Sequence, residues 1–189
     1  MSTFDRLSDL APERVRPLKR VEFERLVSEG LFDDERIELL GGAIVEMSPQ
    51  DTRHAAVIER LDREIKRVAP VSMSVRVQLP FAASEYSLPE PDIVVVPRVD
   101  YDDAHPDCAY LVVEVANTSL RKDRSIKSEL YARAGVPEYW IVNVAEQHIE
   151  MRTLPRDGAY MTVAIAHRGD TVCIASLEGA AIAVSDVLR

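Results

Sequence analysis

Pro89-Glu-Pro-Asp-Ile-Val-Val-Val96 and Tyr110-Leu-Val-Val-Glu-Val115 are the two stretches that constrain the fold of this chain most strongly. Each contains a continuous run of apolar, mostly β-branched residues, which is typical of a central strand buried on both faces. Each also carries an acid, Asp92 before the first run and Glu114 near the end of the second. The interval between the acids leaves room for one loop that joins neighbouring strands. The sequence therefore predicts two adjacent buried strands with a carboxylate at the end of each.

Helical periodicity predicts three helices around these strands. The first follows Pro17 and ends at Gly30, the second spans about residues 53–68, and the third spans about residues 122–134. The apolar positions are Val21, Leu26 and Val27 in the first, Val57, Ile58, Leu61, Ile65 and Val68 in the second, and Ile126, Leu130, Tyr131 and Ala134 in the third.

The remaining segments have strand patterns. Residues 36–47 contain two short runs around Gly41-Gly42, a pair that tolerates the positive φ of a tight hairpin turn. Residues 71–81 alternate as a half-buried strand does, residues 138–144 form a further strand, and the chain from His148 onward is expected to form antiparallel hairpins.

This order of elements predicts an α/β (α+β) fold in which a mixed central β-sheet is flanked by helices. We expect a single domain over residues 1–189, with residues 1–16 as a flexible N-terminal arm.

The composition limits the class of protein. The chain has 189 residues and a mass of 21.2 kDa, with 47% hydrophobic and 29% charged residues, which is typical of one soluble globular domain. Its apolar runs are too short to span a bilayer and no signal peptide is visible, so we expect a cytoplasmic protein without membrane contact. Cys108 and Cys173 lack the spacing of a disulfide scaffold or a zinc site. The net charge of −9 argues against a general nucleic-acid coat protein but allows one local basic patch.

An acid embedded in an apolar strand is costly to bury without a cation or a hydrogen-bond partner. In one interpretation, Asp92 caps a strand and Glu114 forms a structural ion pair with Arg121 or Lys122. In the other, Asp92 and Glu114 together bind a hard divalent cation such as Mg²⁺, which prefers one or two carboxylates plus water and phosphate oxygens. We favour the metal site, because the two acids are expected side by side and a basic helix follows them.

Asp123 and Lys127 are spaced i, i+4 on that helix and share one face. They could form a surface salt bridge worth about a few tenths of a kcal/mol. Alternatively, Lys127 lies near the apolar face, where its ammonium could orient a water molecule or stabilise charge on a phosphate. Spacing alone favours neither interpretation.

A series of motifs runs in order over about residues 19–165. They are Arg36-Ile-Glu-Leu-Leu-Gly-Gly42, Pro89-Glu-Pro-Asp-Ile-Val-Val-Val96, Val113-Glu-Val115, Asp123 with Lys127 and Tyr131, and Gly135-Val-Pro-Glu-Tyr-Trp-Ile-Val142. Together they resemble the Uma2 family, a group of bacterial domains with the restriction-endonuclease-like PD-(D/E)XK nuclease fold.

The resemblance implies a metal-dependent nuclease core in which Asp92, Glu114 and Lys127 are catalytic. Asp92 matches the first acid of the motif and Glu114 the second, but Ala116 stands where a strict motif has lysine. In Uma2-like sequences the lysine lies in the following helix, where Lys127 matches it. Glu38 matches an acid before the glycine turn and is implied as an outer metal ligand beside Asp92 and Glu114.

The implied function is hydrolysis of DNA phosphodiester bonds with Mg²⁺ or Mn²⁺ as cofactor. Asp123 is expected to orient Lys127, and His54 is kept as a supporting residue because of the resemblance. The basic side chains expected to contact backbone phosphates are those of Arg121, Lys122 and Arg124. We also expect a homodimer, because twofold symmetry relates the two strands of a duplex.

A second class of function is a catalytically silent nuclease-fold module that binds or assembles, since a fold does not guarantee an activity. The acidic net charge, Ala116 and the lack of an extra base-recognition element favour this alternative.

Three further predictions concern structure. Gln78 is expected to face solvent, and Tyr131 and Trp140 are expected to be core aromatics. The basic group at Arg60, Arg63, Lys66 and Arg67 is expected to form a solvated helix face, because acids are interleaved with it.

Overall fold

The computed structural model describes residues 16–177 and 179–189. The arm expected at residues 1–16 lies outside these ranges except for Arg16. Within the described ranges, no helix has the length and apolar character needed to cross a membrane.

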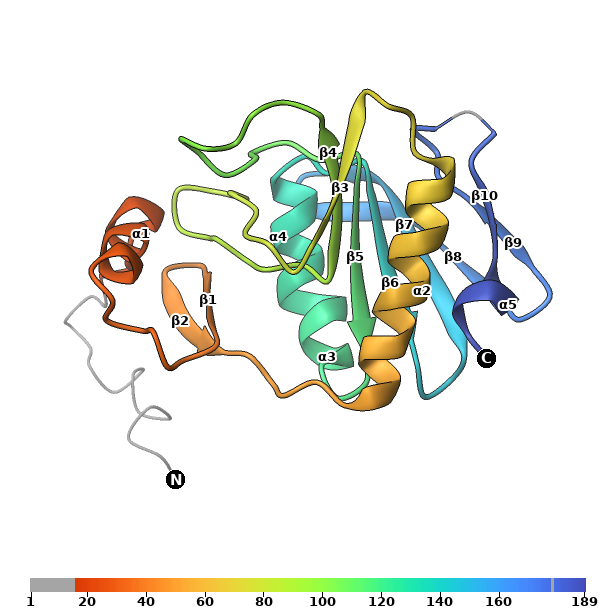
Figure 1. Cartoon of the computed structure of the whole chain (residues 1–189), viewed down its shortest axis with the longest axis horizontal. Helices are drawn as coiled ribbons and strands as arrows, with labels where there is room; N and C mark the ends of the chain where they lie inside the picture. Colours follow the sequence, from red (N-terminus) through yellow and green to blue (C-terminus); the bar gives the residue numbers. More distant parts are fainter. Residues whose placement is uncertain (1–15, 178) are drawn as a thin grey trace.

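A six-stranded mixed sheet forms the centre of the molecule (Figure 1). The strands lie in the order β3-β4-β5-β6-β7-β8, and β5 and β6 are parallel, while every other neighbouring pair is antiparallel. Their bounds are Met73–Val77, Ile93–Pro97, Leu111–Ala116, Glu138–Asn143, His148–Arg156 and Ala159–His167. The mixed sheet and its flanking helices confirm the predicted fold class.

The two helical layers cover opposite faces of this sheet (Figure 1). On one face lies α2 (Thr52–Val68), packed on alternate strand residues such as Val95, Val113 and Trp140. On the other face lies a helix with three parts, α3 (Leu120–Lys122), a π-helical turn (Asp123–Lys127) and α4 (Ser128–Arg133). Its Tyr131 packs with the intervening strand residues, among them Val94, Val112 and Ile141. Strands β4 and β5 are therefore buried on both faces, as their apolar runs predict.

The N-terminal part consists of α1 (Arg20–Ser28) and a hairpin of β1 (Ile37–Leu40) and β2 (Ala43–Glu46). The hairpin confirms the turn predicted at Gly41-Gly42. The predicted apolar face of α1 is wrong, because Val21 and Val27 are 60% and 46% exposed. Phe23 is buried instead, since it stacks on Phe32 with ring centroids 6.0 Å apart, and this contact sets the rotation of the helix.

The C-terminal part adds β9 (Thr171–Cys173), β10 (Ala181–Ala183) and the short helix α5 (Val184–Val187). Their apolar side chains, including Val172, Ile182 and Val184, complete the core beside α2. The hairpins β7–β8 and β9–β10 confirm the antiparallel pattern predicted from His148 onward.

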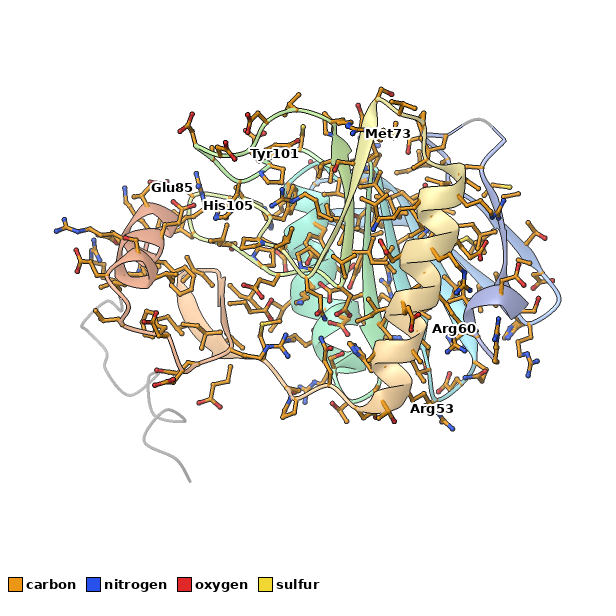
Figure 2. The ribbon with its side chains drawn as sticks, in the orientation of Figure 1. Arg53, Arg60, Met73, Glu85, Tyr101 and His105 are labelled. Carbon is orange, nitrogen blue, oxygen red and sulfur yellow. The ribbon has the colours of Figure 1, made fainter. Side chains whose placement is uncertain are left out.

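The solvated face predicted for α2 forms at Arg63, Lys66 and Arg67, whereas Arg60 is only partly exposed and its Nε is buried without a hydrogen-bond partner in the described chain. Arg63 and Arg67 both pair with Glu64, and Lys66 pairs with Asp62. Figure 2 shows Arg53 at the first turn of α2, at the opposite end of the molecule from Tyr101 and His105 in the loop between β4 and β5.

The hairpin turn provides a test of local geometry. Both glycines have positive φ, +59° at Gly41 and +83° at Gly42, where a side chain costs about 1–2 kcal/mol. A Cβ added at Gly42 would lie 2.3 Å from the Cβ of Pro17, whereas one added at Gly41 meets nothing within 4 Å. We expect Gly42→Ala to lower the free energy of unfolding more than Gly41→Ala, as measured by urea denaturation. Equal losses would contradict the close approach of Pro17.

Candidate active site

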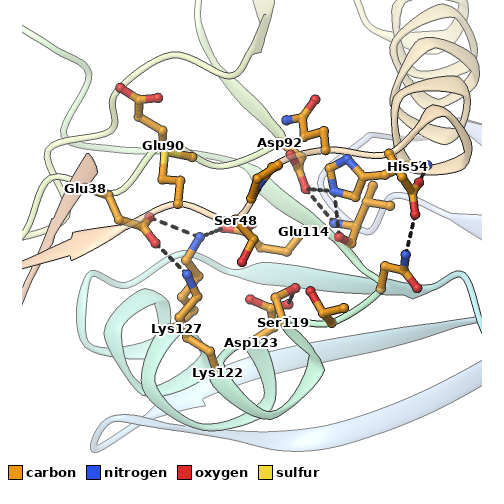
Figure 3. Close-up of a pocket in the computed structure, with 17 residues that line it drawn as sticks. Glu38, Ser48, His54, Glu90, Asp92, Glu114, Ser119, Lys122, Asp123 and Lys127 are labelled. Atoms are coloured by element: carbon orange, nitrogen blue, oxygen red, sulfur yellow. Dashed lines mark hydrogen bonds and ion pairs between the residues drawn. The ribbon is translucent and has the colours of Figure 1, made fainter. Parts of the chain in front are cut away.

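Asp92 and Glu114 converge at one end of the sheet because β4 and β5 are antiparallel neighbours. Asp92 precedes β4 and its Oδ2 accepts a hydrogen bond of 2.8 Å from the backbone N–H of Val115, next to Glu114. Both acids are buried. This juxtaposition is the one predicted from the two apolar runs, and Figure 3 shows both side chains in the same pocket.

Gln78 also contacts Asp92, contrary to the expectation that it faces solvent. Its Nε2 donates to Asp92 Oδ1 over 3.3 Å. Strand β3 ends at Val77, and Gln78 has a φ of 50°, so the alternation of the strand no longer sets its direction. The sequence contains no sign of this backbone turn.

His54 lies on the other side of Asp92. Its Nε2 is 2.9 Å from the carbonyl oxygen of Val115 and 3.3 Å from Asp92 Oδ2. Burial lowers the pKa of His54. The hydrogen bond and the charge of Asp92, with smaller contributions from Val115 and Asp51, raise it by more than burial lowers it, so the net shift of the pKa is upward. Asp51 caps α2 by accepting from the N–H of His54, and it also accepts from Asn117 after β5. The start of α2 is thereby tied to the end of β5.

Glu114 is bound by two donors from the helix on the far face. Its Oε1 accepts from Lys127 Nζ over 2.8 Å and from the hydroxyl of Tyr131 over 2.7 Å. The ion pair that forms is therefore with Lys127, and not with Arg121 or Lys122. Tyr131 and Trp140 are core aromatics as predicted, but the bond from Tyr131 to Glu114 was not anticipated. Burial raises the pKa of Glu114 to about 8, although Lys127 opposes the shift.

Lys127 is 3% exposed and lies between two carboxylates. Besides Glu114, it is 3.2 Å from Glu38 Oε2, and Glu38 Oε1 accepts from Lys122 Nζ over 2.8 Å. Burial lowers the pKa of Lys127, but Glu114 and Glu38 together raise it above its usual value. For Glu38 the directions are reversed. Burial raises the pKa of this carboxyl group, but the two lysines together lower it by more, so its net shift is downward. Both oxygens of Glu38 thus face ammonium groups.

The π-helical turn brings Asp123 and Lys127 to the same buried side of the helix. The N–H of Ser128 donates to the carbonyl of Asp123, five residues back, which widens this turn. Such turns are frequent at functional sites. The widening leaves Ile126 56% exposed, so its predicted place on the apolar face is wrong. A regular helical period could not show this shift.

Asp123 accepts a hydrogen bond from Ser119 over 2.5 Å at Oδ2, while its Oδ1 is buried without a partner among the described residues. Burial raises the pKa of Asp123. Within the same residues no hydrogen bond joins Asp123 to Lys127, which is held instead by Glu114 and Glu38. The role of Asp123 in orienting Lys127 stays a prediction.

The three basic residues expected at phosphates have different surroundings. Arg121 is exposed. Lys122 is paired with Glu38, and Arg124 donates to Glu150 on β7 over 2.8 Å. Contact with a phosphate would require Lys122 or Arg124 to exchange an existing acidic partner.

Asp92, Glu114 and Lys127 line a cavity of about 160 Å³ (Figure 3). Acids outnumber lysines in its lining, which contains Glu38, Asp51, Glu90, Asp92, Glu114 and Asp123 against Lys122 and Lys127. In the described part of the chain, no three Asp, Glu, His or Cys side chains form a ready metal-ligand group. Mg²⁺ nevertheless often takes only one or two carboxylates and fills its other positions with water and phosphate oxygens. The excess of acid and the unpartnered Asp123 Oδ1 fit a cation at Asp92 and Glu114.

Comparisons with known proteins give the family. A family model named Uma2 and described as a putative restriction endonuclease matches residues 20–185. The chain belongs to the Uma2 family. A crystal structure of a putative nuclease belonging to DUF820, from Anabaena variabilis, has the same fold, with a TM-score of 0.74. Its sequence identity is 16%, over 90% of this chain and 97% of that one. No curated protein matches this sequence.

The raised pKa of Glu114 predicts how stability depends on pH. The folded protein retains this proton up to about pH 8, whereas the unfolded chain loses it near the usual glutamate pKa of 4.5. Its contribution is therefore fully present at low pH and is lost as pH rises between these values. In metal-free buffer, wild type should lose stability relative to Glu114→Gln, with a limiting slope of about 1.4 kcal/mol per pH unit.

Urea denaturation at several pH values measures this slope. Glu129→Gln is the control, because Glu129 lies exposed on α4 and is paired with Arg133. Wild type and Glu129→Gln should show parallel pH dependences. A parallel dependence for Glu114→Gln as well would show that Glu114 ionises normally in the folded protein.

Proposed function

We propose that this protein is a cytoplasmic, metal-dependent endonuclease that hydrolyses phosphodiester bonds of DNA and acts as a homodimer. One observation carries the proposal: Asp92 and Glu114 lie side by side at one end of the sheet, and Lys127 reaches Glu114 from the opposite helix. The Uma2 family description supports the nuclease class.

The residues of the chain have distinct roles in this proposal. Asp92 and Glu114 would hold Mg²⁺ or Mn²⁺. When bound, such an ion supplies charge stabilisation for a phosphate and lowers the pKa of a water molecule. Val115, Gln78 and His54 fix the orientation of the Asp92 carboxylate through the contacts described above.

Lys127 would stabilise the negative charge that develops on the phosphate or on the attacking oxygen. Its ammonium is positioned before the substrate arrives, because Glu114 and Glu38 hold it from two sides. Tyr131 holds the same oxygen of Glu114 and so restrains the carboxylate. Arg121 is exposed near this end of the helix and is the first candidate for contact with a backbone phosphate.

The alternative is a nuclease-fold module without catalysis. The observation that favours it is that Lys122 and Arg124 are already paired with acids. Of the three basic residues expected at phosphates, only Arg121 is then available, and the cavity is acidic. Such a cavity repels DNA unless a cation neutralises it.

Calorimetric titration with Mg²⁺ and Mn²⁺ separates the two functions. We expect wild type to bind the metal, and Asp92→Asn and Glu114→Gln to lose binding while keeping the fold. Wild type should also cleave plasmid DNA, and both variants should fall below detection. The exposed residues Asp103 and Glu129 provide matched controls, Asp103→Asn and Glu129→Gln, which should bind and cleave as wild type does. Cleavage at the wild-type rate by Asp92→Asn would refute the site, and metal binding without any cleavage would favour the silent module.

Glu38 can be assigned by a second experiment. Because both its oxygens face lysines, we expect Glu38→Gln to keep metal affinity close to that of wild type and to lose about 100-fold or more in cleavage rate. Lys127→Met should give the same pattern, with Lys66→Met on the solvated face of α2 as control. A large loss of metal affinity in Glu38→Gln would instead make Glu38 the outer metal ligand implied by the family resemblance.

A further inference from the structure

Strand β8 forms one edge of the six-stranded sheet. Eight of its nine residues pair with β7 on one side, all except Met161. Across the described chain, no backbone hydrogen bond joins residues 159–166 to any segment other than β7. The outward-facing N–H and C=O groups of such an edge are a template for another strand.

The middle of β8 is exposed on both faces. Residues 161–165 are all exposed, and Met161, Val163 and Ile165 are 56%, 50% and 54% exposed. Val163 and Ile165 share one face because alternate residues of a strand point the same way. On the neighbouring strand β7, Leu154 is 65% exposed. The edge therefore presents an apolar stripe together with free backbone groups.

β8 also lacks two of the devices that usually protect a sheet edge, which are charges and prolines. Residues 159–166, Ala-Tyr-Met-Thr-Val-Ala-Ile-Ala, contain no charge and no proline. The register with β7 has the same offset on both sides of Met161, but Met161 itself is unpaired opposite Leu154, which has a φ of 58°. The opposite edge, β3, is shorter and carries Arg76. An uncharged and apolar edge of this length is typical of a strand with a partner.

We propose that β8 is a homodimer interface, in which β8 of two copies pair antiparallel about a twofold axis at Val163 and join their sheets. An antiparallel pair of identical strands is self-complementary, so one surface serves both copies. In this register Met161 lies opposite the partner's Ile165, and Val163 lies opposite the partner's Val163. The exposed apolar side chains at the centre of the edge, Val163 and Ile165, are thus brought to the contact between the two copies.

The charges that flank β8 allow this pairing despite the net charge of −9 on each copy. Arg156 and Asp157 lie at one end of the strand, and Arg168 and Asp170 lie at the other, all of them exposed. Antiparallel pairing places each end beside the opposite end of the partner strand. Each end carries both signs of charge, so oppositely charged side chains of the two copies can lie beside each other without forcing like charges together.

This dimer does not depend on the proposed nuclease activity. A twofold axis between antiparallel strands is perpendicular to the joined sheet, so it places the two candidate active sites at opposite ends of that sheet. The duplex symmetry that predicted a homodimer therefore does not account for this surface, which follows from the edge strand itself.

Light scattering after size-exclusion chromatography of the full chain tests the proposal. We expect wild type to have twice the monomer mass of 21.2 kDa at micromolar concentration. Val163→Lys should weaken dimerisation by roughly tenfold or more, because an ammonium would face its own copy at the axis. Val71→Lys is the matched control, because Val71 is 82% exposed and lies outside β8. It should remain dimeric.

A disulfide probe gives an independent measurement. Cys108 and Cys173 are exposed free thiols, so both are first replaced by serine. In that background, oxidation should crosslink Val163→Cys into a covalent dimer much faster than Val71→Cys. A wild type that is monomeric throughout, or a dimer in which neither Val163→Lys nor Val163→Cys differs from its Val71 control, would overturn the proposal.

Discussion

The buried ammonium of Lys127 is the contact on which the candidate site depends. It lies 2.8 Å from Glu114 on β5 and 3.2 Å from Glu38 on β1, so it connects the central sheet, the N-terminal hairpin and the helix between β5 and β6. Each of these carboxylates would be costly to bury alone, and an ammonium placed between them offsets part of that cost. The same contact sets the position of a cationic group that lines the cavity and could meet a phosphate there.

The sheet supplies the second constraint. Antiparallel pairing of β4 with β5 brings residues that are distant in sequence to one end, where the N–H of Val115 holds Asp92. The parallel pairing of β5 with β6 requires a crossover, and the crossover helix carries Lys127 and Tyr131 back to Glu114. The strand topology thus brings the two acids and the lysine together, and the cavity that they line contains more acidic than basic side chains. That imbalance can be relieved by a proton, as the raised pKa of Glu114 indicates, or by a divalent cation.

Most of the fold and part of the site were predictable from the residues. The buried runs of β4 and β5, the hairpin at Gly41-Gly42 and the apolar face of α2 all have short-range patterns that survive in the structure. The exposed Val21 and Ile126 and the inward-turned Gln78 were not predictable. A stacking contact, a widened helical turn and a positive φ set these three positions, and none of them leaves a periodic trace in the sequence.

The sequence by itself determined which segments form strands, which of these strands are buried on both faces, and which acids lie at their ends. The reason is that burial of a β-branched run is a local requirement of each segment. Only the tertiary structure decided the partners of those acids. Glu38 and Glu114 share Lys127, and Tyr131 reaches Glu114 from a core position. The physical reason is that a buried charge selects its counter-charge by distance in the folded chain, and that distance depends on strand order, helix crossover and the extra residue in the π-helical turn.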